Sequence, residues 1–83
     1  MSNEYRKQDV ARAFGLVLRA TRVERGISQD MLSGICDFDR TYPSLLERGL
    51  RCPTLAMLLR LASALRIDPA RLLIETLRRL PTT

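Results

Sequence analysis

The segment from Ile27 to Gly49 constrains the fold more than any other part of the chain, because two helix start signals lie close together in it. Ser28 is a residue type that caps helix N-termini, and Asp30 follows in the first turn, where the helix dipole favours a carboxylate. Asp39 is a second capping residue, and Gly49 supplies the left-handed residue that often follows a helix. The segment is therefore predicted to form two short helices joined by a tight turn, with Asp39 as the cap of the second.

The turn itself is predicted at Asp37, directly after a first short helix that ends near Cys36. Aspartate enters the left-handed backbone conformation more readily than most residues other than glycine. Pro43 stands four places after Asp39, lacks a backbone donor and disfavours helical geometry at Tyr42. We therefore expect the first turn of the second helix to be displaced or irregular.

Upstream of this segment, the sequence predicts one long helix that begins between Asn3 and Asp9 and runs to Arg25. Gly26 follows as the expected C-terminal stop. Side chains that recur with a helical period define its core face, namely Val10, Phe14, Val17, Leu18 and Thr21.

Two further helices are predicted downstream. Thr54 is the expected cap of the first, and Asp68 caps the second, whose first position suits Pro69. The predicted core face of the helix after Thr54 consists of Leu55, Leu58, Leu59, Ala62 and Leu65. No stretch alternates between apolar and polar residues, so the predicted fold class is all-α, a five-helix bundle in one domain, residues 1–83.

Composition excludes several classes of function. The 83 residues contain no histidine, and Cys36 and Cys52 are the two cysteines. Imidazole acid–base chemistry and His–Cys metal sites are excluded, and two cysteines alone do not form a structural zinc site, so no enzyme, cofactor or metal is expected. Since no secretory signal or long apolar run is present, we expect a cytoplasmic protein with reduced thiols and no membrane partner.

The net charge is +5, and arginine carries nearly all of the positive charge. The planar guanidinium group of arginine can donate paired hydrogen bonds to a phosphate or to guanine. A basic balance of this size fits a polyanionic partner, and it also fits a basic protein that is merely soluble. Charge alone therefore leaves both interpretations open.

Many residues at fixed spacing resemble the Xre-like phage-repressor helix-turn-helix family, over roughly residues 10–73. The matching positions are Arg22–Gln29, Leu32, Leu46–Gly49, Pro53–Leu55 and Leu58–Leu65. A shorter set is similar to the controller proteins of restriction–modification systems, which are short, dimeric members of this family: Asp39–Tyr42, Ser44, Glu47 and Arg48. The resemblance implies a helix-turn-helix core at about 10–66 and a C-terminal dimerisation helix at 67–83.

Three positions depart from the family pattern. Ser33 replaces the usual alanine, Asp37 replaces the usual turn glycine, and Pro43 replaces a branched apolar residue in the recognition helix. Pro43 alters the start of that helix. The family geometry is therefore carried over least directly to the residues just before Pro43.

The N-terminal residues of the second short helix are the candidate base-reading residues, because a recognition helix points that end at base edges in the major groove. Arg40, Thr41 and Ser44 hold these positions. Arginine can donate two hydrogen bonds to guanine, and threonine can bond either type of base or contact a thymine methyl. Gln29, at the start of the preceding helix, is expected to meet a phosphate.

Four further side chains have two interpretations each. Arg48 and Arg51 either bind backbone phosphates or are solvated cations. Tyr42 either contacts DNA or packs on the bundle. Leu45 either touches a thymine methyl or covers the edge of the bundle.

The resemblance also implies an internal ion pair between Arg22 and Glu47 that clamps the first helix to the third. A solvated surface pair is the alternative. Glu47 is accordingly interpreted as a structural residue and not as a catalytic acid.

A single helix-turn-helix reads only a few base pairs, and a two-fold dimer on a pseudo-palindrome is the usual solution. The candidate dimer residues are the apolar positions of the last helix, Leu72, Leu73, Ile74, Leu77 and Leu80. Some of them must close the small core, and all of them could do so.

These observations predict a transcriptional regulator that binds double-stranded DNA sequence-specifically as a homodimer on a pseudo-palindromic operator, in the bacterial nucleoid. The controller of a restriction–modification operon is the sharpest version of this prediction. A prophage repressor and an antitoxin-type regulator are close alternatives, and a protein-interaction module on the same fold is an alternative of another class. RNA polymerase, with which such a regulator shares promoter DNA, is a further partner left open.

Overall fold

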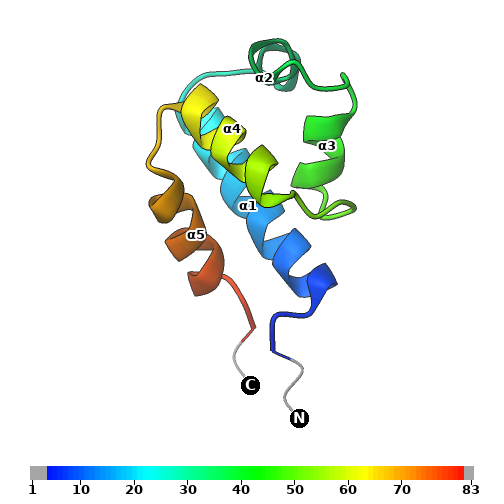
Figure 1. The fold of residues 1–83 in the computed structure, drawn as a ribbon, viewed down its shortest axis with the longest axis vertical. Helices are drawn as coiled ribbons and strands as arrows, with labels where there is room; N and C mark the ends of the chain where they lie inside the picture. The colour runs from blue at the N-terminus through cyan, green and yellow to red at the C-terminus, as the bar shows by residue number, and fades with distance from the viewer. Residues whose placement is uncertain (1–3, 82–83) are drawn as a thin grey trace.

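The computed structural model describes residues 4–81, and within that range they form five α-helices and no strand (Figure 1). The helices are α1 (Lys7–Glu24), α2 (Gln29–Cys36), α3 (Tyr42–Glu47), α4 (Leu55–Leu65) and α5 (Pro69–Arg78). In Figure 1, α1 runs through the middle of the molecule, α3 and α5 lie on opposite sides of it, and α2 lies at the end far from the start of α1. The predicted all-α class with five helices is confirmed.

Local capping signals set most of the helix starts. The side chains of Ser28, Thr54 and Asp68 each accept a backbone N–H bond of 2.9 to 3.1 Å at the starts of α2, α4 and α5. Asp37 closes α2 in the left-handed conformation, with φ of 56°, as the sequence predicts. Gly49 has φ of 73° and ends α3 in the same region, where a glycine has no Cβ to strain.

The start of α3 differs from the prediction. Thr41 and not Asp39 holds the cap position, and the carboxylate of Asp39 instead accepts bonds from the backbone N–H and the hydroxyl of Thr41, at 3.0 and 2.9 Å. Pro43 explains the shift, because a residue without an N–H is tolerated in the first turn of a helix but not further inside it. The displaced first turn is therefore confirmed, and the assignment of Asp39 as the cap is wrong. Arg40 and Thr41 precede the helix.

The core is formed by side chains from all five helices. The largest fully buried side chains are Phe14, Leu18, Leu32, Pro43, Leu46, Leu61, Leu65 and Leu72. On α1, Phe14, Val17 and Leu18 confirm the predicted inward face, and Val10 and Thr21 are half-buried at its edge. α1 and α3 approach so closely at Gly15 that a Cβ there would collide with the carbonyl oxygen of Leu46.

The inward face of α4 is rotated from the predicted one. Leu55 and Leu59 are exposed, whereas Leu61, which was not predicted to be inside, is fully buried beside Ala62 and Leu65. Apolar residues surround this helix on most sides, so periodicity alone does not identify the face that packs.

In α5, Leu72 is fully buried in the core, and Thr76 lies beside it with its hydroxyl bonded to the Leu72 carbonyl at 2.8 Å. The assignment of Leu72 to a dimer surface is therefore wrong, because its side chain has no surface left to offer. Leu73, Ile74 and Leu77 are exposed, and Leu80 is half-buried.

Within residues 4–81, none of the helices combines the length and the apolar character that crossing a bilayer requires.

Candidate nucleic-acid interface

The surface formed by the start of α2, the turn and α3 contains the predicted DNA-contacting residues. Pro43 and Leu46 turn one side of α3 into the core, so the other side faces outward. On α3 itself, Tyr42, Ser44 and Leu45 are half-buried; in the segments that flank it, Arg40, Thr41, Arg48 and Arg51 are exposed. Figure 1 shows α3 on an outer flank of the molecule.

Arg22 and Glu47 hold this surface in place. The Arg22 guanidinium donates to the Glu47 carboxylate from Nε at 2.6 Å and from Nη2 at 3.0 Å, and Nη1 donates to the carbonyl of Ile27 at 2.8 Å. The two side chains are only 14% and 4% exposed, so the pair is largely buried and not a solvated surface pair. The hydrogen bond to Glu47 raises the pKa of Arg22, against the opposing effect of burial. α1 and α3 are thus joined at their C-terminal ends.

Gln29 extends this cluster toward α2. Its side-chain amide donates to Glu47 Oε1 at 3.0 Å, so it points at the ion pair and not freely into solvent. Its position as the first residue of α2 matches the predicted phosphate contact, but that contact stays a prediction.

Arg40 is held by an acidic residue that the sequence did not single out as a partner. Its Nε and Nη2 lie 3.4 and 3.2 Å from the two carboxylate oxygens of Asp30. This hydrogen-bonded carboxylate raises the pKa of Arg40. The two residues are ten apart and lie in different elements, so only the packing of α2 against the approach to α3 brings them together.

Thr41 lies beside Arg40, and both its donors are engaged by Asp39. The backbone bond and then the hydroxyl bond from Thr41 lower the pKa of the Asp39 carboxyl. Ser33 holds the opposite side of the turn, because its buried hydroxyl bonds the carbonyl of Gln29 at 3.0 Å and lies 3.5 Å from that of Arg40. The loop that presents Arg40 and Thr41 is therefore tied down locally on both sides.

Tyr42 packs on the bundle. Its ring meets that of Phe38 edge-on, with centroids 5.1 Å apart and planes at 77°. Burial is the main reason why the pKa of its hydroxyl is raised. Of the two interpretations of Tyr42, packing is observed, and contact of its hydroxyl with DNA stays a prediction.

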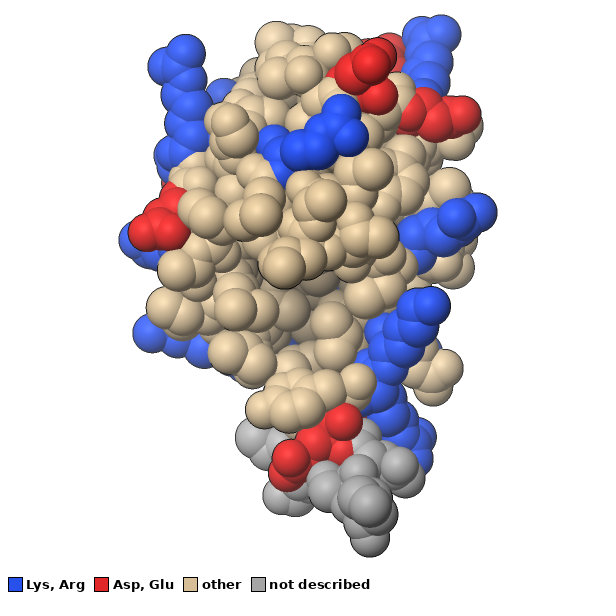
Figure 2. Space-filling model, in the orientation of Figure 1, with Lys and Arg blue, Asp and Glu red and all other residues tan. Residues whose placement is uncertain are grey.

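Basic side chains protrude from this flank and from other parts of the surface. Figure 2, drawn in the orientation of Figure 1, shows Lys and Arg on both edges and on the front of the molecule. Along the edge where α3 and the following loop lie, acidic groups stand among them near the end occupied by α2. Arg48, the residue that follows α3, and Arg51, in the loop beyond it, are exposed and can meet a polyanion.

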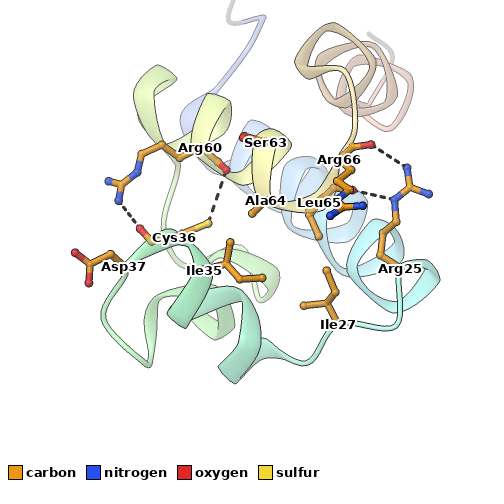
Figure 3. A pocket seen from close by; sticks show the side chains of 10 residues that line it. All are labelled: Arg25, Ile27, Ile35, Cys36, Asp37, Arg60, Ser63, Ala64, Leu65 and Arg66. Atoms are coloured by element: carbon orange, nitrogen blue, oxygen red, sulfur yellow. Dashed lines mark hydrogen bonds between the residues drawn. The ribbon is translucent and has the colours of Figure 1, made fainter.

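A separate hollow of about 810 Å³ lies between α2 and α4, and no residue of α3 lines it. Figure 3 shows that two of its three arginines are engaged: Arg60 bonds the carbonyl of Cys36, and Arg25 bonds those of Leu65 and Arg66. Cys36 in its wall is buried, which raises the pKa of its thiol. Within the described part of the chain, no three His, Cys, Asp or Glu side chains are grouped to bind a metal ion. We interpret this hollow as part of the scaffold.

Comparison with known proteins agrees with this geometry. A family model described as helix-turn-helix matches residues 18–72. An uncharacterized HTH-type transcriptional regulator, y4dJ of Sinorhizobium fredii, is 34% identical over 68 residues, which cover 82% of this chain and 88% of that protein.

Solved structures agree as well. The clp gene regulator ClgR from Corynebacterium glutamicum superposes with a TM-score of 0.82 at 27% identity, covering 89% of this chain and 96% of that one. The restriction–modification controller protein C.AhdI from Aeromonas hydrophila is 40% identical, with a TM-score of 0.72 over 75% of this chain and 94% of that one. The resemblance to controller proteins inferred from the sequence is confirmed. The chain belongs to the helix-turn-helix family of DNA-binding transcriptional regulators, which is not a class of enzymes.

Proposed function

We propose that this chain is a sequence-specific regulator that binds a pseudo-palindromic operator as a homodimer, in the manner of the controller of a restriction–modification operon. One observation carries the proposal: an exposed set of polar side chains at the start of α3 is held in place by a buried ion pair at its end. The 40% identity with a controller protein supports the narrower assignment.

In this proposal Arg40, Thr41 and Ser44 read base edges in the major groove. A bidentate arginine contact to guanine contributes about 1–3 kcal/mol of discrimination against a wrong base. Gln29, Arg48 and Arg51 contact phosphates and set the position of the protein on the duplex, which adds affinity without reading sequence. Tyr42 and Leu45 adjoin these residues in the chain, and in this proposal they contact the same groove.

The second copy is proposed to dock on α5. Leu73, Ile74 and Leu77 are 51%, 47% and 46% exposed, and they share the side of the helix that faces away from buried Leu72 and Thr76. With half-buried Leu80 they form an apolar face that a partner copy would cover, and a self-complementary face is what a two-fold dimer needs.

DNA binding is tested by footprinting the protein on the DNA upstream of its own gene and by selecting duplexes from a random-sequence library. We expect one protected pseudo-palindrome, whose half-sites are about one helical turn apart. Arg40→Ala should lose preference at particular base pairs, whereas Arg48→Ala and Arg51→Ala should weaken binding to all sequences alike and reduce the salt dependence. Arg71→Ala, an exposed arginine of α5, is the matched control.

A protein that selects no sequence over random DNA at moderate ionic strength would refute the proposal. The dimer is tested by light scattering and sedimentation. Leu77→Glu should weaken self-association and operator binding together, while Val23→Glu, at an exposed apolar position on α1, should leave both unchanged.

A further inference from the structure

The ion pair between Asp30 and Arg40 places a carboxylate beside the arginine that is proposed to read a base. Both side chains are exposed, at 65% for Asp30 and 81% for Arg40, so the pair faces the solvent that DNA would replace. A carboxylate on a DNA-binding surface is unfavourable for overall affinity, because phosphates repel it. Its position against Arg40 therefore calls for a reason other than affinity.

The hydrogen-bond donors of Arg40 suggest such a reason. A guanidinium has five N–H donors in a planar fork, and Asp30 occupies Nε and one hydrogen of Nη2. The end of the fork, made by Nη1 and the remaining hydrogen of Nη2, stays free. That end offers two parallel donors, which is what O6 and N7 of guanine accept. Arg40 can therefore bond guanine while it keeps its contact with Asp30.

Base edges and phosphates respond differently to this pair. A guanine edge carries no net charge, so the neighbouring carboxylate weakens its hydrogen bonds to Arg40 far less than it weakens a contact with a phosphate. A phosphate is an anion, and part of its attraction to Arg40 is cancelled by the charge of Asp30 beside it. The pair thus leaves donors of Arg40 free to bond a base and reduces the attraction of Arg40 for phosphate.

We propose that Asp30 is a specificity-determining residue. It favours contact of Arg40 with a base edge over contact with a phosphate, and it lowers the affinity of the protein for DNA that lacks the operator sequence. Asp30 acts through Arg40 and is a positioning residue in this role. Because the proposal rests on the proposed function, in which Arg40 reads a base, its test starts from a wild-type protein that has been shown to select an operator.

The test is Asp30→Asn, which keeps the shape of the side chain and removes its charge. Dissociation constants are measured over a range of salt concentrations for the selected operator and for a scrambled duplex of the same length and composition. We expect affinity for the scrambled duplex to rise several-fold, with a salt slope steeper by about 0.9, the value for one additional phosphate contact. Affinity for the operator should rise less, so the ratio of the two affinities should fall several-fold.

Asp37→Asn is the matched control. It removes an exposed carboxylate from the other end of α2, at a left-handed position that asparagine also tolerates, and should leave the ratio unchanged. A second comparison repeats Asp30→Asn in an Arg40→Gln background. There the ratio should no longer respond to residue 30, because the side chain on which Asp30 acts is gone.

The possible outcomes are distinct. Equal changes in affinity for both duplexes would mean that Asp30 acts only as a bulk negative charge, and would overturn the inference. So would a fall in the ratio that persists without Arg40, since residue 30 would then act by another route. A wild-type protein that selects no operator in the first place would refute the proposed function itself, and the inference with it. A lower melting temperature for Asp30→Asn at an unchanged ratio would show only the helix-dipole role of Asp30 and would also overturn the inference.

Discussion

The guanidinium of Arg22 and the carboxylate of Glu47 meet in a two-point contact that joins the C-terminal end of α1 to that of α3, with Nε and Oε2 2.6 Å apart. Gln29 donates to the same carboxylate from the start of α2. Three helices of the motif therefore converge on one acidic side chain, and the angle at which α3 is presented depends on it.

Removing Glu47 should be strongly destabilising. Glu47→Ala leaves the mostly buried Arg22 without its partner, and breaking a buried pair from one side typically lowers the free energy of unfolding by about 3–5 kcal/mol. Urea unfolding followed by circular dichroism measures the change. The double variant Arg22→Met with Glu47→Leu should recover much of the loss, because no charge is then stranded. A loss below about 1 kcal/mol for Glu47→Ala would match a solvated pair and contradict the buried one.

Replacing two helical glycines, Gly15 and Gly34, with alanine should change the stability of the protein in opposite directions. A Cβ at Gly15 would collide with the carbonyl oxygen of Leu46 and lie 2.8 Å from that of Glu47, so α1 and α3 would have to separate. Overpacking of this kind costs about 1–3 kcal/mol or more, which exceeds the gain of about 1 kcal/mol in helix propensity. A Cβ at Gly34 would have no heavy atom of another group within 4 Å. Gly34→Ala should therefore raise the free energy of unfolding by about 0.5–1 kcal/mol. Thermal unfolding of the two variants side by side tests this, and equal shifts would show that α1 and α3 do not approach so closely.

The Asp39 carboxyl should titrate below its usual range. Its pKa is lowered by the bond from the Thr41 backbone N–H and, to a smaller extent, by that from the Thr41 hydroxyl. Since the folded-state pKa is depressed, the interaction contributes to stability above the unfolded-state pKa, and this contribution is lost as the pH falls through the folded-state pKa. NMR titration of the carboxyl resonance should show a partial return toward normal in Thr41→Val, because the larger, backbone contribution remains. A full return would assign the shift to the hydroxyl alone.

The two thiols should differ in reactivity. Cys36 is buried in the core, and burial raises the pKa of its thiol, so little reactive thiolate forms near neutral pH. Cys52 lies half-buried in the loop after α3. With a thiol-labelling reagent at neutral pH, mass spectrometry should detect rapid modification of Cys52 and modification of Cys36 only on unfolding. Rapid labelling of both under native conditions would place Cys36 outside the core.

Local signals predicted most of the fold. Ser28, Thr54 and Asp68 cap helices by reaching backbone groups two or three residues away, so short stretches of sequence contain all the partners involved. Pro43 predicted a displaced start of α3 for the same reason, since its missing N–H acts on its own turn. The cap at Asp39 was wrong because two local effects competed there, and the constraint from Pro43 prevailed.

The candidate site was only partly predictable. Arg40, Thr41 and Ser44 were identified from their position in the motif, and the pairing of Arg22 with Glu47 came from the family resemblance. Packing of Tyr42 on the bundle was one of two interpretations that the sequence left open, and the structure supplies Phe38 as its partner. The contact of Asp30 with Arg40 carried no such signal, because it depends on how the approach to α3 packs against α2, which no local pattern encodes.

The sequence by itself determined that this chain is helical and where its helices begin and end to within a few residues, because caps, turns and periodicity act over one or two turns of backbone. It also determined which family the chain resembles, through residues at fixed spacing. The tertiary structure alone decided which leucines face inward, since Leu61 and Leu72 are buried while Leu59 and Leu73 are exposed. Apolar residues on several sides of a helix satisfy the same period, and only the neighbouring helices select the side that loses contact with water.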